Sequence, residues 1–298
     1  ETVKGFLLGW LETYAATNVT LRTLHGYRGY VKRYLDPTIG AIPLQSLTVR
    51  HIQAVYAGML DKGLSNTTVV QVHRILRESL KHAVKWGVLT RNVADAASPP
   101  KVQRKQMDMW DVETVCRFME NAKESRFGDL YSLAILTGLR RSELCGLRGQ
   151  QVDLVRGSVS VVGTLQRITG YGLVEGQPKT ARSRRSIALS PQATDVLHSI
   201  RGQQIEQQLE AGPVWQNTDY VFTGTEGSPI APDMISKDFC ALVRKYGLPH
   251  LTFHGLRHAH ATLLLTSGVH AKVVSERLGH SNIGITMDIY SHVLPGLQ

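Results

Sequence analysis

A proline-containing break about one third of the way along the chain places the strongest constraint on its fold. Residues 95–107 read DAASPPKVQRKQM, and the SPP motif excludes a helix there, because proline forces the residue before it out of the helical region. With 298 residues, the chain is also longer than most single domains. We therefore predict two domains, residues 1–97 and 108–298, joined by a linker at 98–107.

The first domain carries only helical patterns. Apolar side chains recur at helical spacing, Asn, Ser and Thr stand at cap positions, and glycine or proline follows the helix ends. These signals predict helices at about 3–16, 20–35, 48–60 and 65–86. No strand pattern interrupts them, so we predict a compact, all-α domain of four helices.

Positive charge is concentrated in this first part of the chain. The net charge is +10, and residues 1–107 hold 15 Lys and Arg against 6 Asp and Glu, whereas residues 108–298 hold 19 against 18. A basic module beside a nearly neutral one suggests that the first domain grips a polyanion, although a solvated, lysine-rich surface would also explain the charge. Taken as a set, the basic residues on the polar helix faces are candidate DNA phosphate contacts: Arg22, Arg28, Lys32, Arg74, Arg77 and Lys81.

The second domain mixes helical and strand patterns. Alternating or β-branched stretches at 158–162, 164–168 and 185–189 predict a small antiparallel sheet, with a polar hairpin loop at 177–184 between the last two strands. The predicted helices lie at about 112–122, 129–137, 141–147, 191–210, 232–246, 254–267, 271–278 and 282–292. We expect a mainly α protein, in which an all-α domain precedes an α+β domain.

Composition excludes several classes of protein. The chain is 42% hydrophobic and 19% charged, and no apolar run approaches the roughly 20 residues of a membrane span. Three scattered cysteines lack zinc-ligand spacing and predict a reduced, cytoplasmic protein without disulfides. Because the chain begins with Glu1 and not methionine, we expect it to be a fragment or a processed form, so the absence of a signal peptide excludes little.

Two arginines suit the cleavage of a phosphodiester. The transition state of that reaction concentrates negative charge on the non-bridging oxygens, and a guanidinium stays ionised and donates paired hydrogen bonds to them. Arg140 follows a glycine in TGLRRSEL, and Arg257 lies one helical turn after His254 in HGLRH. We predict that both arginines face one phosphodiester. Glu143, one turn after Arg140, can hold that arginine in place.

The remaining chemistry needs a nucleophile and proton transfer. Tyr290 can attack as a phenolate, although a phenol with a pKa near 10 must lose its proton as it does so. A histidine, His254 or His280, can take that proton or orient the oxygen. Lys179, in the predicted hairpin loop, can supply a proton to the leaving 5′ oxygen.

Each of these residues also has an ordinary structural explanation. A lone tyrosine such as Tyr290 is more often a packing residue, loop lysines are common, and Arg140 with its neighbour could be a surface pair. His254, His258 and His260 resemble a metal cluster, but no glutamate follows His254 as in a zinc protease. A guanidinium on the same face would also repel a cation. We therefore predict no metal and no cofactor, and expect His258 and His260 to pack or to face solvent.

In this order, the motifs resemble those of the tyrosine recombinase family, also called the phage integrase family. Its hallmark is an arginine, a hairpin lysine, His-x-x-Arg, a histidine or tryptophan, and a tyrosine. The corresponding segments of this sequence are TGLRRSEL, PKTARSRRSI, HGLRHAHAT, ERLGHSNIGIT and YSHV. PTIGAIPLQSLT, GLSNTTV and LKHAVKWGVLTRN are similar to the family's helical core-binding domain. The resemblance assigns catalysis to Arg140, Lys179, His254, Arg257, His280 and Tyr290.

The resemblance implies a site-specific DNA recombinase of a phage or an integrative element. Two domains would form a C-shaped clamp on double-stranded attachment-site DNA, with Arg182 and Arg184 as further DNA contacts. Tyr290 would form a 3′-phosphotyrosine and release a 5′ hydroxyl, and strand exchange would pass through a Holliday junction in a tetramer. Accessory bending or directionality factors are expected partners, and the expected location is the cytoplasm, on nucleoid DNA.

Two departures and three alternatives accompany this interpretation. Integrases of this kind often carry an arm-site DNA-binding domain, which would precede Glu1, and many extend beyond the tyrosine to dock on a neighbouring subunit. Only eight residues follow Tyr290, which puts tetramer formation by this chain in doubt. The alternatives are DNA relaxation by a type IB topoisomerase, chromosome dimer resolution by a Xer-type recombinase, and a regulator that binds DNA without cutting it.

Overall fold

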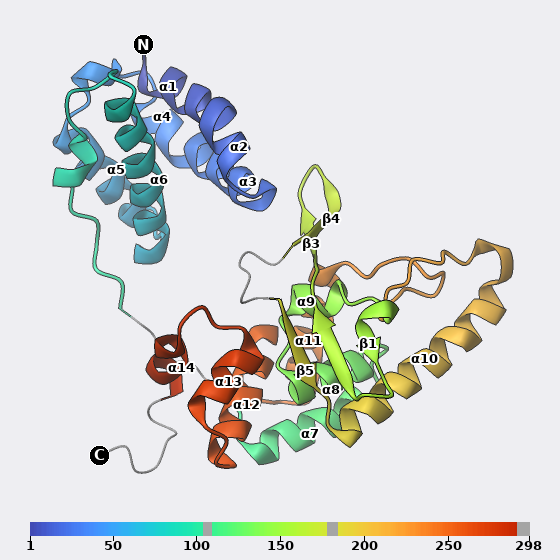
Figure 1. Cartoon of the computed structure of the whole chain (residues 1–298). Coiled ribbons are helices and arrows are strands. Elements are labelled where there is room, and N and C mark those ends of the chain that lie inside the picture. Colours follow the sequence, from blue (N-terminus) through green and yellow to red (C-terminus); the bar gives the residue numbers. More distant parts are fainter. Residues whose placement is uncertain (104–108, 178–183, 291–298) are drawn as a thin grey trace. The chain divides into compact units, whose positions relative to one another are not determined.

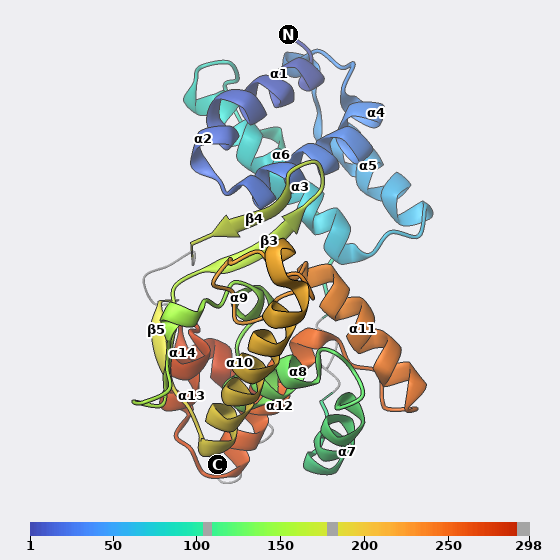
Figure 2. The same ribbon diagram turned by 90° about the vertical axis from the view of Figure 1, so that its right-hand side faces the viewer.

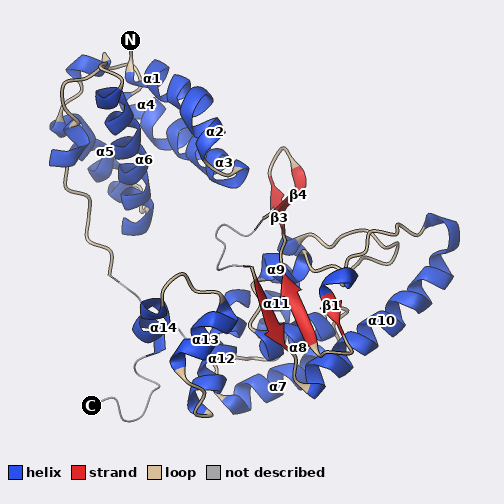
Figure 3. Ribbon diagram, viewed as in Figure 1, coloured by secondary structure: helices blue, strands red, loops and turns tan. Residues whose placement is uncertain are grey.

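The chain folds into two compact units, Glu1–Gln106 and Met107–Gln298 (Figure 1). The computed structural model describes residues 1–103, 109–177 and 184–290, except for the side chains of 288–290. The boundary between the units falls inside the segment that we predicted to be a linker, 98–107. Figure 3 shows helices throughout the first unit and strands in the second unit, as the sequence patterns predicted.

The first unit contains the four predicted helical segments. Two of them are continuous rods in which π-helical turns, Leu11–Ala15 and Val31–Leu35, join shorter α-helices. Thr48 and Ser65 cap the other two, since each hydroxyl accepts a hydrogen bond from the backbone N–H three residues later. The helices are α1 (Val3–Trp10), α2 (Ala16–Asn18), α3 (Leu21–Tyr30), α4 (Asp36–Ile39), α5 (Val49–Asp61) and α6 (Asn66–Lys85), with 3-10 turns at Leu44–Ser46 and Val93–Ala96.

The second rod runs past its predicted end at Leu35. Asp36 keeps a helical backbone although a proline follows it, and the fixed φ of Pro37 suits the first turn of α4. The helix therefore continues to Ile39. The core of this unit surrounds Trp10, which is buried and whose indole Nε1 lies 3.2 Å from Nδ1 of His82 on α6.

The second unit combines eight α-helices in the described ranges with two small sheets. The strands are β1 (Val152–Asp153), β2 (Ser158–Val161), β3 (Thr164–Ile168), β4 (Gly172–Gly176) and β5 (Arg185–Ala188). The helices are α7 (Val112–Ala122), α8 (Gly128–Thr137), α9 (Arg141–Cys145), α10 (Pro191–Ala211), α11 (Pro232–Lys245), α12 (Phe253–Thr266), α13 (Ala271–Leu278) and α14 (Ile283–Tyr290), with 3-10 turns at Gly149–Gln151 and Gly212–Val214.

The strands form two antiparallel sheets where we predicted one. One sheet has the order β1-β2-β5, with Val159 opposite Ile187, and the other is the hairpin of β3 and β4, with Leu165 opposite Glu175. The mainly α, α+β fold class is confirmed, but the predicted hairpin between 164–168 and 185–189 is wrong.

The unpredicted strand β4 explains that error. Gly170 and Gly172 adopt φ values of 82° and 75°, and the N–H of Tyr171 donates to the carbonyl of Ile168 at 2.9 Å, so the chain reverses at once after β3. A strand that begins and ends with glycine lacks the usual strand composition. The segment 177–184 therefore follows β4 and connects the two sheets.

Helix α8 lies at the centre of the second unit. An aromatic cluster, in which the ring centroids of Phe118 and Phe239 are 5.2 Å apart, packs α7 and α11 against Tyr131 of α8. The Tyr131 hydroxyl donates to Asp238 at 2.6 Å. This packing anchors the first turn of α8, and the other end of the helix leads into the candidate site. Figures 1 and 2 show α13 beside α12 and β5 at the same end of the unit.

None of the helices in the described ranges combines the length and the apolar character that crossing a membrane requires.

Candidate active site

Two left-handed glycine turns meet at the candidate site. Gly138 ends α8 with φ 68°, and Gly279 ends α13 with φ 65°. A Cβ at Gly138 would come within 2.5 Å of the His260 ring and 2.8 Å of a Leu278 methyl group, so the two turns approach too closely for any larger residue. The first turn leads directly into Arg140, which occupies the N-cap position of α9.

Arg257, on α12, connects the two turns. Its side chain is buried, Nη1 donates to the carbonyl of Gly138 at 2.8 Å, and Nη2 donates to the carbonyl of Leu278 at 2.5 Å. Arg140 donates from Nη2 to the next carbonyl along, that of Gly279, at 3.2 Å. The structure therefore brings the two predicted arginines together on neighbouring carbonyls of one turn.

Glu143 holds Arg140 by two hydrogen bonds. The backbone N–H of Arg140 donates to Oε2 at 2.9 Å, and Nη1 donates to Oε1 at 2.7 Å. Burial raises the pKa of the Glu143 carboxyl, but hydrogen bonds and positive charge from Arg185 and then Arg140 outweigh it, and the pKa is lowered overall. Glu143 is therefore a carboxylate at neutral pH.

Arg185, at the start of β5, is a second partner of this carboxylate that sequence reasoning missed. Its Nη1 and Nη2 donate to Oε1 and Oε2 of Glu143 at 3.2 and 3.0 Å, and its Nε donates to the carbonyl of Arg277 at 2.6 Å. The sequence signalled only the start of a strand here, because the partners of Arg185 lie in other elements.

His254 lies in the first turn of α12, one helical turn before Arg257, with part of its surface exposed. The part that is buried lowers the pKa of its imidazole, and the charges of Arg257 and Arg140 lower it further. The His258 ring packs edge-on against it, with centroids 4.9 Å apart. At neutral pH His254 is therefore uncharged and able to accept a proton.

His280 directly follows Gly279. Its Nδ1 lies 2.8 Å from the hydroxyl of Thr286 on α14, which orients the ring. Burial, followed by the charges of Arg257 and Arg140, lowers the pKa of His280 to about 4. Both arginines thus act on both predicted histidines, and the four groups share one electrostatic site.

His260 has a structural position instead. It is buried, its Nδ1 lies 2.7 Å from the carbonyl of Ile135, and its Nε2 accepts a hydrogen bond from Nε of Arg277 at 3.1 Å. Arg277 also donates to the carbonyls of Leu136 and Ala188. His258 is buried as well, so neither residue faces solvent, which our prediction had left open. In the part of the chain that is described, no three His, Cys, Asp or Glu side chains are grouped as a metal site requires.

Three predicted residues lie wholly or partly outside the described part of the chain. Lys179 and Arg182 lie outside the described residues, and Tyr290 closes α14 but has a side chain that is not described. Arg184 is exposed and donates from Nη2 to Oε1 of Gln177 at 2.7 Å. Of the predicted site residues, the structure brings together both arginines, both histidines and Glu143.

The DNA-contact candidates of the first unit are all exposed: Arg22, Arg28, Lys32, Arg74, Arg77 and Lys81. The last three follow one face of α6 at spacings of three and four residues. Nε of Arg77 lies 2.6 Å from a carboxylate oxygen of Asp95, so part of its charge is already balanced within the unit.

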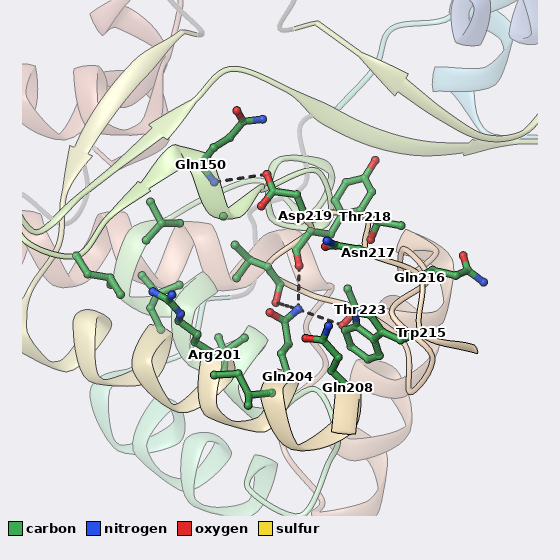
Figure 4. Close-up of a pocket in the computed structure, with 18 residues that line it drawn as sticks. Gln150, Arg201, Gln204, Gln208, Trp215, Gln216, Asn217, Thr218, Asp219 and Thr223 are labelled. Atoms are coloured by element: carbon green, nitrogen blue, oxygen red, sulfur yellow. Dashed lines mark hydrogen bonds between the residues drawn. The ribbon is translucent and has the colours of Figure 1, made fainter. Parts of the chain in front are cut away.

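A separate cavity of about 470 Å³ lies between α10 and the 215–223 segment (Figure 4). Nε2 of Gln204 donates to the carbonyls of Tyr220 and Val221 at 2.8 and 3.1 Å, which ties the two walls together. The described residues that line this cavity do not include the two arginines or the two histidines of the candidate site.

Comparison with known proteins decides the family. Residues 105–296 match the phage integrase family, and residues 2–60 match the N-terminal SAM-like domain of phage integrases. The chain belongs to the phage integrase family. A tyrosine recombinase XerC-like protein of Caldanaerobacter subterraneus subsp. tengcongensis is 30% identical over 286 residues, covering 90% of this chain and 72% of the relative. The ICEBs1 integrase of Bacillus subtilis is 27% identical over 257 residues, covering 86% and 69%.

Solved structures of this family share the fold. The Tn1549 transposon integrase, solved in complex with transposon right end DNA, superposes with a TM-score of 0.83 at 24% identity, covering 97% of this chain and 95% of that one. A lambda integrase dimer, bound to a COC′ core site, superposes with a TM-score of 0.74 at 19% identity, covering 97% and 95%. The mainly α architecture predicted from the sequence is thus the architecture of integrases.

Proposed function

We propose that this chain is a site-specific recombinase of a mobile element that cuts and rejoins double-stranded DNA through a covalent 3′-phosphotyrosine at Tyr290. The observation that carries the proposal is the meeting of Arg140 and Arg257 on neighbouring carbonyls, with uncharged His254 and His280 beside them. Membership of the phage integrase family supports it.

The first step is a transesterification. The phenolic oxygen of Tyr290 attacks the scissile phosphorus while the bond from phosphorus to the 5′ oxygen breaks. The phenolic proton passes to one of the two uncharged histidines, and Lys179 donates a proton to the leaving 5′ oxygen. Arg140 and Arg257 stabilise the charge on the non-bridging oxygens, which develops only as the reaction proceeds.

The second step reverses the first with a different strand. A 5′ hydroxyl from a partner duplex attacks the phosphotyrosine, so the new phosphodiester forms as Tyr290 leaves, and no nucleotide cofactor is consumed. We propose that this exchange passes through a Holliday junction held by four copies of the chain. A lambda integrase tetramer has been solved on such a junction, which supports the proposal.

The two units divide the work of binding DNA. We propose that residues 1–97 contact the core of the attachment site, that 98–107 link the units, and that 108–298 catalyse. The excess of basic residues in the first part of the chain supports this division, since phosphate contacts dominate the affinity of proteins for DNA. In this proposal the protein acts on nucleoid DNA in the cytoplasm, with bending or directionality proteins as additional partners.

Covalent trapping tests the proposal. The substrate is a library of duplexes with a randomised core and a nick near the cleavage position. After cutting, the short fragment that carries the new 5′ hydroxyl dissociates, so the reverse reaction is prevented and the adduct accumulates. Wild-type protein should become linked to DNA, and sequencing of the linked DNA identifies the site. Tyr290→Phe should shift the same DNA in a gel and form no adduct. A wild-type protein that binds but never becomes linked would leave the non-cutting regulator as the better description.

A Xer-type resolvase is the second candidate, because the XerC-like relative reaches 30% identity. Plasmids that carry two copies of the trapped site, on one molecule or on two, separate the candidates. A resolvase should recombine sites on one molecule, whereas an integrase should also join two molecules. Relaxation of supercoils without any exchange of strands would favour a topoisomerase instead.

A further inference from the structure

One carboxylate is shared by two guanidinium groups at the candidate site. Both oxygens of Glu143 accept hydrogen bonds from Arg140 and from Arg185, at distances of 2.7 to 3.2 Å. The side chains of Glu143 and Arg185 are 3% and 6% exposed, whereas that of Arg140 is 34% exposed. Arg140 is therefore the member of the trio that an incoming anion can reach.

The charge balance of this trio depends on Arg185. With both arginines present, the group carries a net charge of +1. Without Arg185, the buried carboxylate would pair with Arg140 alone, and the net charge at the site would fall to zero. Charges interact strongly in such a poorly solvated place. The loss of one positive charge would therefore weaken the electrostatic attraction between the site and a phosphate that contacts Arg140.

We propose that Arg185 is a positioning residue that neutralises Glu143 and so leaves the charge of Arg140 available to the scissile phosphate. This inference rests on the proposed function, because it assigns a role within that reaction. Glu143 is needed to fix the geometry of Arg140, and Arg185 removes the electrostatic penalty that this carboxylate would otherwise impose.

A second contact links Arg185 to the turn that positions Arg257. Its Nε donates to the carbonyl of Arg277, the residue just before Leu278, whose own carbonyl accepts from Arg257. A Cβ at Gly279 would lie 3.0 Å from Nη1 of Arg185, so the guanidinium packs directly against the turn. Arg185 therefore sits between the shared carboxylate and the turn that holds both catalytic arginines.

Three variants separate a charge role from a merely structural one: Arg185→Met, Glu143→Gln and the double variant E143Q/R185M. Single-turnover cleavage of the nicked duplex is measured with saturating protein, alongside gel-shift affinity and thermal melting. Arg185→Met should slow cleavage on the order of 100-fold, the usual cost of losing one transition-state donor, because Glu143 would then neutralise Arg140. Binding should change far less. The double variant should cleave at least tenfold faster than Arg185→Met, because no carboxylate remains to neutralise Arg140.

Arg185→Lys and Arg148→Met are the controls. The lysine keeps the positive charge beside Glu143 and should cleave faster than Arg185→Met. Arg148 is another half-buried arginine paired with a glutamate, with Nη2 2.6 Å from Glu175 at the base of the β3–β4 hairpin, and it has no contact with the shared carboxylate. Its loss should leave the cleavage rate within a fewfold of wild type.

Two results would overturn the inference while the proposed function stands. In the first, wild type forms the adduct and Arg185→Met forms it equally fast. In the second, the double variant is folded but no faster than Arg185→Met, which would mean that Arg185 acts only as a brace. If Arg185→Met does not fold, the test rests on the cleavage rate of the folded double variant compared with wild type. A double variant that cleaves at less than about a thousandth of the wild-type rate would overturn the charge role. A wild-type protein that forms no adduct overturns the proposed function and the inference together.

Discussion

Arg140 and Arg257 donate hydrogen bonds to neighbouring carbonyl oxygens of one turn, those of Gly279 and Leu278, at 3.2 and 2.5 Å. The two arginines are far apart in sequence and come from different helices. Their shared contacts with this turn fix the position of one guanidinium group relative to the other. Arg257 is also fixed by the carbonyl of Gly138, and its orientation is therefore set before any DNA arrives. Such preorganisation is what stabilisation of a transition state requires.

Arg257→Lys should slow cleavage severely while the protein still binds DNA. A lysine keeps the charge, but one amine cannot reach both the Gly138 and the Leu278 carbonyls or present a fork to a phosphate. We expect a loss of at least about 100-fold in single-turnover cleavage of the nicked duplex. Arg244→Lys, an exposed change on α11, is the control and should cleave like wild type. Equal rates for Arg257→Lys and wild type would contradict the proposed role.

Gly138→Ala should destabilise the second unit by about 2–4 kcal/mol, because a left-handed φ and a collision add together. The new Cβ would lie 2.5 Å from the His260 ring. Gly170→Ala is a matched control, since its φ is 82° but its Cβ would meet nothing within 4 Å, and it should cost only about 1 kcal/mol. Urea denaturation of both variants measures the difference, and equal losses would mean that the close approach of the two turns is unimportant.

Stability should fall as the pH drops from about 6.5 toward 4. Burial, and then the charge of Arg277, lowers the pKa of His260 from 6.5 to about 4, so in this window the unfolded chain takes up a proton that the folded chain does not. His260→Gln should be less stable at pH 7 yet lose less stability on going to pH 5, by on the order of 1–2 kcal/mol. The exposed His198→Gln should show the wild-type slope, and an unchanged slope for His260→Gln would count against this origin of the acid sensitivity.

Lys179→Ala should slow cleavage but hardly change binding. In our proposal Lys179 protonates the leaving 5′ oxygen, and a sulfur at that position leaves as a thiolate without needing a proton. A duplex with a bridging 5′ sulfur should therefore restore the rate of the variant toward that of wild type. If the sulfur substrate reacts as poorly as the normal one, the lysine has some other role.

Binding should weaken steeply with salt, and the residues of α6 should contribute unequally. Arg74→Ala is expected to reduce the slope of log affinity against log salt by about one, as the loss of one phosphate contact does. Arg77→Ala should reduce it less, because Asp95 already balances part of that charge at 2.6 Å. Fluorescence anisotropy over a range of salt concentrations gives both slopes, and a flat dependence for wild type would undercut the role of the basic unit.

The sequence by itself predicted most of the helices, a chain of two units and the order of the candidate catalytic motifs. These features depend on local information, namely apolar periodicity, caps and breakers within a few residues of each other. The sequence patterns did not predict strand β4, because it begins and ends with glycine and is defined by its pairing with β3, not by its own composition.

Only the tertiary structure decided how the site is held. Arg185 meets Glu143 across 42 residues of sequence, and Arg257 meets the carbonyl of Gly138 across 119. Backbone carbonyls carry no side-chain signature, so no motif could reveal that two glycine turns orient the arginines. The sequence can identify side chains whose chemistry suits a reaction. The packing of distant elements determines which of those side chains form ion pairs with one another.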